Sequence, residues 1–177
     1  MPLVALAYPE LAQKNREWIE DFRSKHDELY ARVVKAHFTL VFPVADVEVS
    51  EFIHHIQKML EGVHPIHFVL RCAVLVKDAF NTYSHVLLVP DEGYSNIVKL
   101  HDQLYTGLLS RELRLDIPFI PHIGVGNAED VMKCKALVDK LNTEHFEIAG
   151  AINEIEIVDY VNDAVKPVQR LRLGKDA

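Results

Sequence analysis

The sequence lacks the features that define several protein classes. It has only two cysteines, Cys72 and Cys134, and both lie in apolar patterns, which is typical of buried thiols in a reducing compartment. No run approaches the roughly 18 consecutive apolar residues of a membrane-spanning helix, and the opening residues do not resemble an export signal. No stretch rich in proline, glycine or serine suggests a linker. We therefore expect a single cytoplasmic domain over residues 1–177, with no membrane partner.

Positive charge is also scarce. The chain has 19 Lys and Arg against 26 Asp and Glu, which gives a net charge of −7. Proteins bind long nucleic acids largely by neutralising phosphates, so this balance argues against a long DNA or RNA partner. It leaves room for a small phosphorylated ligand in a locally positive cleft. No glycine-rich phosphate loop is present, so the sequence does not support nucleoside triphosphate chemistry.

Helical and strand-like patterns alternate along the chain. The predicted helices cover residues 9–29, 51–60 (after Ser50 as the N-cap), 97–108 and 127–141. The predicted strands cover residues 3–8, 34–42, 66–77, 84–90, 119–125, 146–160 (interrupted near Gly150) and 167–173. Only residues 78–83 separate two of these strands, which indicates a hairpin and excludes a purely parallel sheet. The pattern predicts an α+β fold with helices packed on mainly antiparallel sheet.

Two of the ten histidines occur in similar surroundings, about half the chain apart. Alternate side chains of a strand share a face. On the first strand His37 and Thr39 therefore face away from a set of residues expected in the core: Val34, Ala36, Phe38, Leu40 and Phe42. On the second strand His122 and Gly124 face away from another such set: Pro121, Ile123 and Val125. Each strand thus presents one imidazole to the same kind of surface.

Two imidazoles at a shared cleft are sufficient for phosphodiester chemistry without a metal. One neutral histidine takes a proton from the attacking water or hydroxyl, and a protonated one donates to the leaving oxygen. The ordinary imidazole pKa near 6.5 suits both roles at neutral pH. The hydroxyl of Thr39, two residues after His37, is placed to hold a non-bridging phosphate oxygen.

The motif His37–Thr39 and the second histidine after a proline, Pro121-His122, resemble those of the two-histidine (2H) phosphoesterase superfamily, in particular the bacterial 2'-5' RNA ligase-like and cyclic phosphodiesterase-like proteins. The order of helices and strands agrees over nearly the whole chain. The resemblance implies a bilobal, pseudo-twofold α+β fold. Its mainly antiparallel sheets would face a central cleft, with the helices outside and one histidine in each lobe.

The same resemblance implies a hydrolase that needs no cofactor. Its substrates would be 2',3'-cyclic or 2'-5' phosphodiester groups of small nucleotides or RNA ends, as in RNA processing. His37 and His122 would be the catalytic residues, and Thr39 would bind phosphate. The oligomeric state does not follow from the resemblance.

Gly124 departs from the family pattern, which has Thr or Ser two residues after the second histidine. One interpretation is that Gly124 and Gly126 let backbone N–H groups approach and bind the phosphate in place of the hydroxyl. Another is a non-catalytic module that binds a nucleotide or phosphate in the same cleft. A third is that both histidines are structural.

Weaker candidates lie elsewhere in the chain. Arg71 or Lys77, on the polar face of the predicted strand 66–77, could contact the phosphate, although a solvated sheet face is an equal alternative. Tyr83, in the hairpin loop, could stack on a base. The adjacent His54 and His55 would diverge by about 100° on a helix, and no zinc-ligand spacing occurs, so we expect no metal site.

Overall fold

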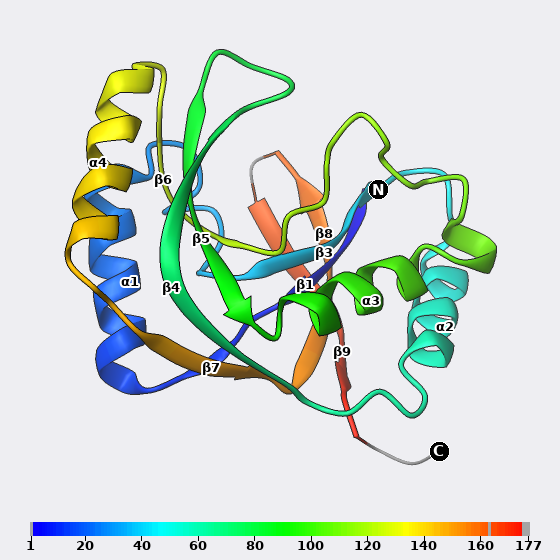
Figure 1. Cartoon of the computed structure of the whole chain (residues 1–177). Helices are drawn as coiled ribbons and strands as arrows, with labels where there is room; N and C mark the ends of the chain where they lie inside the picture. The colour runs from blue at the N-terminus through cyan, green and yellow to red at the C-terminus, as the bar shows by residue number, and fades with distance from the viewer. Residues whose placement is uncertain (1, 163, 175–177) are drawn as a thin grey trace.

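Two antiparallel β-sheets form the centre of the computed structural model, and helices flank them (Figure 1). The structure describes residues 2–162 and 164–174. In chain order the elements are β1 (Leu3–Ala7), β2 (Glu10–Leu11), α1 (Gln13–His26), β3 (Phe38–Val44), α2 (Val49–Met59), β4 (Ile66–Lys77), β5 (Ser84–Glu92), α3 (Tyr94–Leu104), the 3-10 helix η1 (Gly107–Leu109), β6 (Ile123–Ala128), α4 (Val131–Thr143), β7 (Ile148–Ile152), β8 (Glu154–Val161) and β9 (Ala164–Arg172). The predicted α+β class is confirmed.

The strands are divided between two sheets. Sheet A has the order β3-β1-β8-β9, and sheet B has the order β2-β7-β4-β5-β6. The described strand pairs within both sheets are antiparallel. β4 and β5 form the expected hairpin, with Lys77 paired to Ser84 across the loop of residues 78–83.

The helices form two groups on opposite sides of the view in Figure 1. α1 contacts β6, and α4 contacts β4, β5 and β6, so this pair covers sheet B. α3 contacts β3 of sheet A and is itself contacted by α2. Among the described residues, no helix is long and apolar enough to cross a membrane.

Sheet A is apolar on both faces where β1 crosses it. Leu3, Ala5 and Ala7 alternate into the main core, which explains their complete burial. The intervening Val4 and Leu6 point the other way and pack with Val158 of β8 in a second, smaller apolar cluster. A strand of five buried residues therefore separates two apolar regions rather than a core from solvent.

All four helix starts differ from the predicted ones. α2 begins at Val49 and α3 at Tyr94, before the predicted starts, so Ser50 lies inside α2 and Glu48 is its N-cap. The other two helices begin later than predicted because strand pairing extends further than the periodicity indicates. Residues 10–11, expected in the first helix, form β2 and pair with Gly150 and Ala151 of β7. Asn127, expected to open the last helix, stays in β6 opposite His85. That helix begins at Val131 instead, after Asp130, whose carboxylate accepts the Met132 N–H.

Candidate active site

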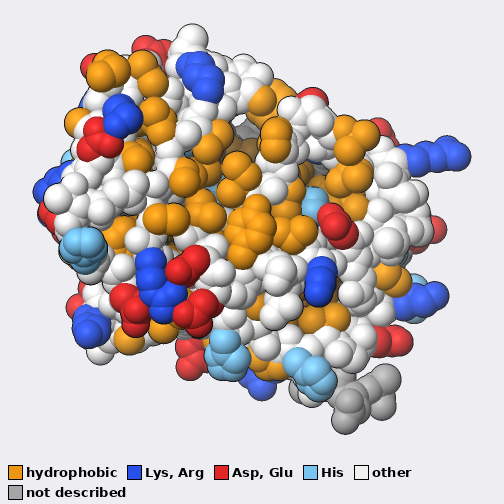
Figure 2. Space-filling model, in the orientation of Figure 1, with side chains coloured by type: hydrophobic (Ala, Val, Ile, Leu, Met, Phe, Trp, Pro, Cys, Tyr) orange, Lys and Arg blue, Asp and Glu red, His pale blue; other side chains and the backbone are white. Residues whose placement is uncertain are grey.

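A cavity of about 590 Å³ is lined by residues of both sheets, and His37, Thr39, His122 and Gly124 all lie in its wall. Figure 2 shows this side of the molecule hollowed near its centre, with apolar side chains gathered around the hollow. The four residues singled out from the two sequence motifs therefore come together at one cavity, although half the chain separates the motifs.

The two histidines hold equivalent positions in the fold. His37 directly precedes β3 and His122 directly precedes β6, so each ring lies at the entry of a strand rather than within it. The Nδ1–H of His37 donates to the carbonyl of Lys35 at 2.7 Å, and that of His122 donates to the carbonyl of Ile120 at 2.6 Å. A carbonyl can only accept, so both neutral rings carry their proton on Nδ1. Nε2 is then the nitrogen that can accept or release a proton during a reaction.

Burial sets the charge state of both rings. Burial lowers the pKa of His37 to about 4, although the hydrogen bond to the Lys35 carbonyl raises this pKa. The positive charges of Arg23 and His122 lower it, as burial does. Burial also lowers the pKa of His122, with a further contribution from His85. Both imidazoles are therefore neutral near pH 7. A bound phosphate anion favours the protonated form, so it would raise both pKa values.

A buried ionic network also lines the cavity, and the sequence did not predict it. Arg23 of α1 pairs with Asp27 at 3.0 Å, and both side chains are no more than 3% exposed. Asp27 also accepts the side-chain N–H of Asn127 of β6 at 2.5 Å, and all three residues lie in the cavity wall. A helical pair four residues apart is normally an exposed one, so sequence spacing alone could not reveal this burial.

The network holds the segment that leads to His37. Arg23 donates to the carbonyl of Val34 at 2.7 Å, and Glu20 accepts the backbone N–H of Ala36 at 2.8 Å. Both ends of this short segment are thus fixed to α1. The residue between them supplies the carbonyl that orients the His37 ring. Arg23 and Glu20 are therefore positioning residues for His37.

A third histidine in the cavity wall was also missed. His85 of β5 lies 2.7 Å, Nε2 to Oδ2, from Asp78 of the hairpin loop, and its ring stacks on Tyr30. Burial alone would raise the pKa of Asp78, but hydrogen bonds from the Phe80 N–H and from His85 hold it below its usual range. Across the described part of the chain, no group of three or more His, Cys, Asp or Glu is placed to hold a metal ion.

Of the two basic residues on β4, the structure brings only Lys77 to the cavity. Its ammonium group donates to the carbonyl of Thr82 in the hairpin loop. Tyr83, in the same loop, is outside the cavity wall, so the structure does not place its ring where it would stack on a base bound in the cavity.

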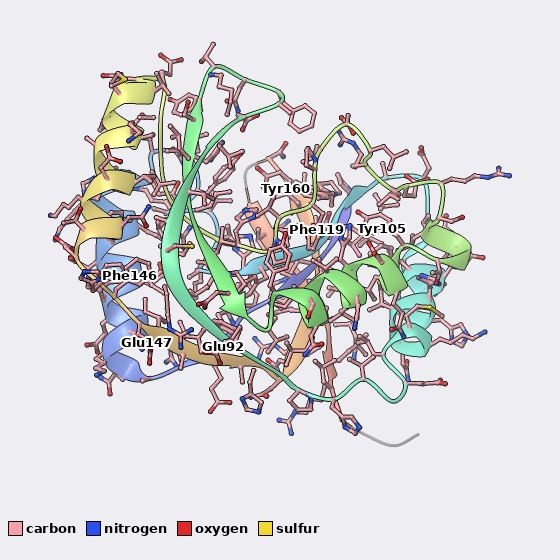
Figure 3. All side chains as sticks on the ribbon, in the orientation of Figure 1. Glu92, Tyr105, Phe119, Phe146, Glu147 and Tyr160 are labelled. Atoms are coloured by element: carbon pink, nitrogen blue, oxygen red, sulfur yellow. The ribbon has the colours of Figure 1, made fainter. Side chains whose placement is uncertain are left out.

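Arg71 lies on a different part of the surface. Its guanidinium binds Asp91 at 2.9 Å, Glu92 at 2.6 Å and Glu147 at 2.8 Å. Figure 3 shows Glu92 and Glu147 well apart from Phe119 and Tyr160, which line the cavity. Three carboxylates bind Arg71 outside the cavity wall, so the structure does not bring Arg71 together with the two histidines.

Two apolar residues expected in the core also line the cavity. Val34 does so because residues 34–37 are not part of the strand, which begins at Phe38. Phe42 does so because the β1–β3 register shifts between the pairs Leu6–Thr39 and Ala5–Val41. The bulge reverses the alternation, so Val41 is buried in the core and Phe42 faces the cavity.

Comparison with known proteins agrees with this architecture. Three similar solved structures are E. coli LigT complexed with 3'-AMP (15% identity, TM-score 0.57, 98% of each chain covered), TT0787 of Thermus thermophilus (13%, 0.62, 98% of each) and Kluyveromyces marxianus Usb1 (11%, 0.57, 97% of this chain and 98% of that one). No curated protein matches the chain. The family model described as the 2'-5' RNA ligase superfamily matches residues 9–164. The chain therefore belongs to the 2'-5' RNA ligase superfamily of two-histidine phosphoesterases.

Proposed function

We propose that this protein is a metal-independent phosphodiesterase that acts on 2',3'-cyclic or 2'-5' phosphodiester groups of small nucleotides or RNA ends. His37 and His122 share the acid and base roles, Thr39 binds a phosphate oxygen, and the backbone at Gly124 shapes the opposite side of the site. Membership of a phosphoesterase superfamily supports this activity in general terms.

One observation carries the proposal: His37 and His122 line the same cavity, and each uses Nδ1 for a backbone carbonyl two residues earlier. Such bonds fix the ring orientation and leave Nε2 for proton transfer. A purely structural histidine is expected to use both ring nitrogens in hydrogen bonds or to be packed away from any cavity. The matching geometry of two rings from separate halves of the chain favours a shared task.

These positions support the following course for hydrolysis of a cyclic phosphodiester. One neutral imidazole takes a proton from water as the water oxygen bonds to phosphorus. The bond from phosphorus to one ring oxygen breaks, and the second, protonated imidazole gives that oxygen its proton. The Thr39 hydroxyl donates to a non-bridging oxygen and stabilises the charge that develops there. The product is a phosphate monoester.

The test is hydrolysis of 2',3'-cyclic AMP in excess EDTA. We expect His37→Ala and His122→Ala each to lower turnover about 10²- to 10⁴-fold. His54→Ala is the matched control because His54 is exposed on α2 and outside the cavity wall, so it should retain full turnover. No turnover by the native protein, or full turnover after both cavity substitutions, would falsify the proposal.

Lys77 and Arg71 offer a second matched pair, since both are basic residues of β4. Lys77→Ala removes a cation from the cavity wall and should raise KM about fivefold, corresponding to roughly 1 kcal/mol for a partly exposed ion pair. Arg71→Ala removes a cation held by three carboxylates outside the cavity and should leave KM unchanged. An equal rise in KM for both variants would contradict a specific role of Lys77, and would indicate that the basic residues of β4 act only through the overall charge of the protein.

A further inference from the structure

Most of the cavity wall that surrounds the proposed phosphate-handling groups is apolar. Sheet A contributes several aliphatic side chains and the loops contribute aromatic ones, among them Val4, Leu6, Val158, Val165, Phe80 and Phe119. Val4, Leu6 and Val158 form the second apolar cluster of sheet A, separate from the main core. This cluster gives the cavity an aliphatic surface, on which a polar ligand would lose hydrogen bonds to water without replacing them.

The cations of the wall are largely neutralised already. Arg23 is buried against Asp27, and Arg114 binds Asp116 at 2.6 Å while it lies over the Phe80 ring. Among the described residues, Lys77 is the cation of the wall that has no carboxylate partner. The wall is therefore suited to one negative charge. A chain of several phosphates needs more cations than this.

The cavity mouth is apolar as well. Phe80 lies in the hairpin loop, lines the cavity and is still 64% exposed. Figure 2 shows hydrophobic side chains continuing from the hollow onto the surrounding surface. Exposed apolar area of this kind, continuous with a cavity, is typical of a ligand-binding surface.

We infer that the preferred substrate is a small cyclic phosphodiester with a single negative charge and an apolar organic part, such as the cyclic phosphate of a 1,2-diol that bears an alkyl chain. This inference rests on the proposed function, since it assumes that His37 and His122 open a phosphodiester ring. The volume of about 590 Å³ suits one small molecule. An RNA end brings additional phosphates and polar base edges, for which the wall offers few partners.

The experiment uses the native protein and the cyclic phosphates of propane-, butane- and hexane-1,2-diol. These compounds share one reacting ring and one charge and differ only in the apolar chain. We expect kcat/KM to rise about fourfold for each added methylene that becomes buried, hence about sixtyfold over the three methylenes from propane to hexane. A hexanucleotide RNA that ends in a 2',3'-cyclic phosphate should be hydrolysed no faster than 2',3'-cyclic AMP.

Two variants test the location of the effect. Phe80→Ala removes an exposed aromatic ring of the cavity mouth and should lower the hexane-to-propane ratio of kcat/KM at least threefold. Leu115→Ala is the control, because Leu115 is 87% exposed and outside the cavity wall, and should leave the ratio unchanged.

The outcomes separate this inference from the proposed function. The inference is overturned if the hexane-to-propane ratio of kcat/KM is near one, or if the RNA end is hydrolysed faster than 2',3'-cyclic AMP. If turnover of 2',3'-cyclic AMP still requires His37 and His122, the proposed function stays intact. Absence of hydrolysis of every cyclic phosphate overturns both. A rising series that Phe80→Ala flattens and Leu115→Ala does not supports the inference.

Discussion

Replacement of Gly124 by threonine tests how the second half of the site binds phosphate. Gly124 lies two residues after His122 in the cavity wall, as Thr39 lies two residues after His37. A Cβ atom at Gly124 would meet no neighbour closer than Leu87 Cδ2 at 4.0 Å, and the backbone there is not in the left-handed region. Gly126 differs, since a Cβ there would lie 3.2 Å from the His26 carbonyl. Gly124→Thr is therefore expected to fold without strain.

The size of the effect follows from one added hydrogen bond. A bond to a charged group contributes about 1.5 to 3 kcal/mol, which corresponds to roughly a ten- to hundredfold change in rate. If the Thr hydroxyl reaches a phosphate oxygen in the transition state, kcat/KM for 2',3'-cyclic AMP should rise by that factor. The gain should depend on Thr39 as well, because the two hydroxyls bind the same phosphate from opposite sides.

Gly124→Val is the matched control, because valine has nearly the shape of threonine and lacks the hydroxyl. The assay compares kcat/KM of the native protein and both variants on the same substrate. A rise with threonine and none with valine assigns the gain to the hydroxyl and indicates a site weakened by its glycine. Equal values for threonine and the native protein would refute the reasoning, and would indicate that backbone N–H groups already bind that oxygen.

Two further predictions concern stability. The unfolded chain protonates its histidines near pH 6.5, whereas folded His37 does so near pH 4, so the free energy of unfolding should fall as pH falls from about 6.5 to about 4. Urea titrations of the His37→Gln variant should show a smaller fall in the free energy of unfolding over this pH range than those of the native protein. An equal fall would contradict the assignment of the low pKa to His37. Arg23→Leu leaves the buried Asp27 carboxylate without its ionic partner and should cost about 3 to 5 kcal/mol. Lys25→Ala, in an exposed pair of the same helix, should cost less than about 0.5 kcal/mol, and similar losses for both would exclude a special role for the buried pair.

Local patterns predicted much of the fold because they report burial directly. The twelve residues of β4 were predicted at their observed bounds, since apolar side chains alternate along the strand and a turn follows it. The hairpin to β5 follows from the short loop. Elements whose bounds depend on a distant partner were predicted less well. β2 exists only because two residues before α1 pair with β7, and nothing in its own sequence indicates this.

The site shows the same division. His37, Thr39 and His122 could be found because each lies in a recognisable local pattern beside apolar residues. Arg23, Asp27 and Asn127 could not, since their burial arises only when α1 meets β6. A charged residue in an amphipathic helix is predicted to be exposed. Only the tertiary contact shows that this pair lies under the cavity.

The two histidines combine matching geometry with different surroundings. The equivalent positions before β3 and β6 give both rings the same Nδ1 bond, so either Nε2 can exchange a proton. Their neighbours differ, because Arg23 influences His37 while His85 influences His122. In the proposed reaction one ring gives a proton while the other takes one, and different surroundings are one way to divide these roles between two like groups. The repeated architecture therefore supplies two equivalent rings, and the unrepeated side chains around them give each ring a different electrostatic environment.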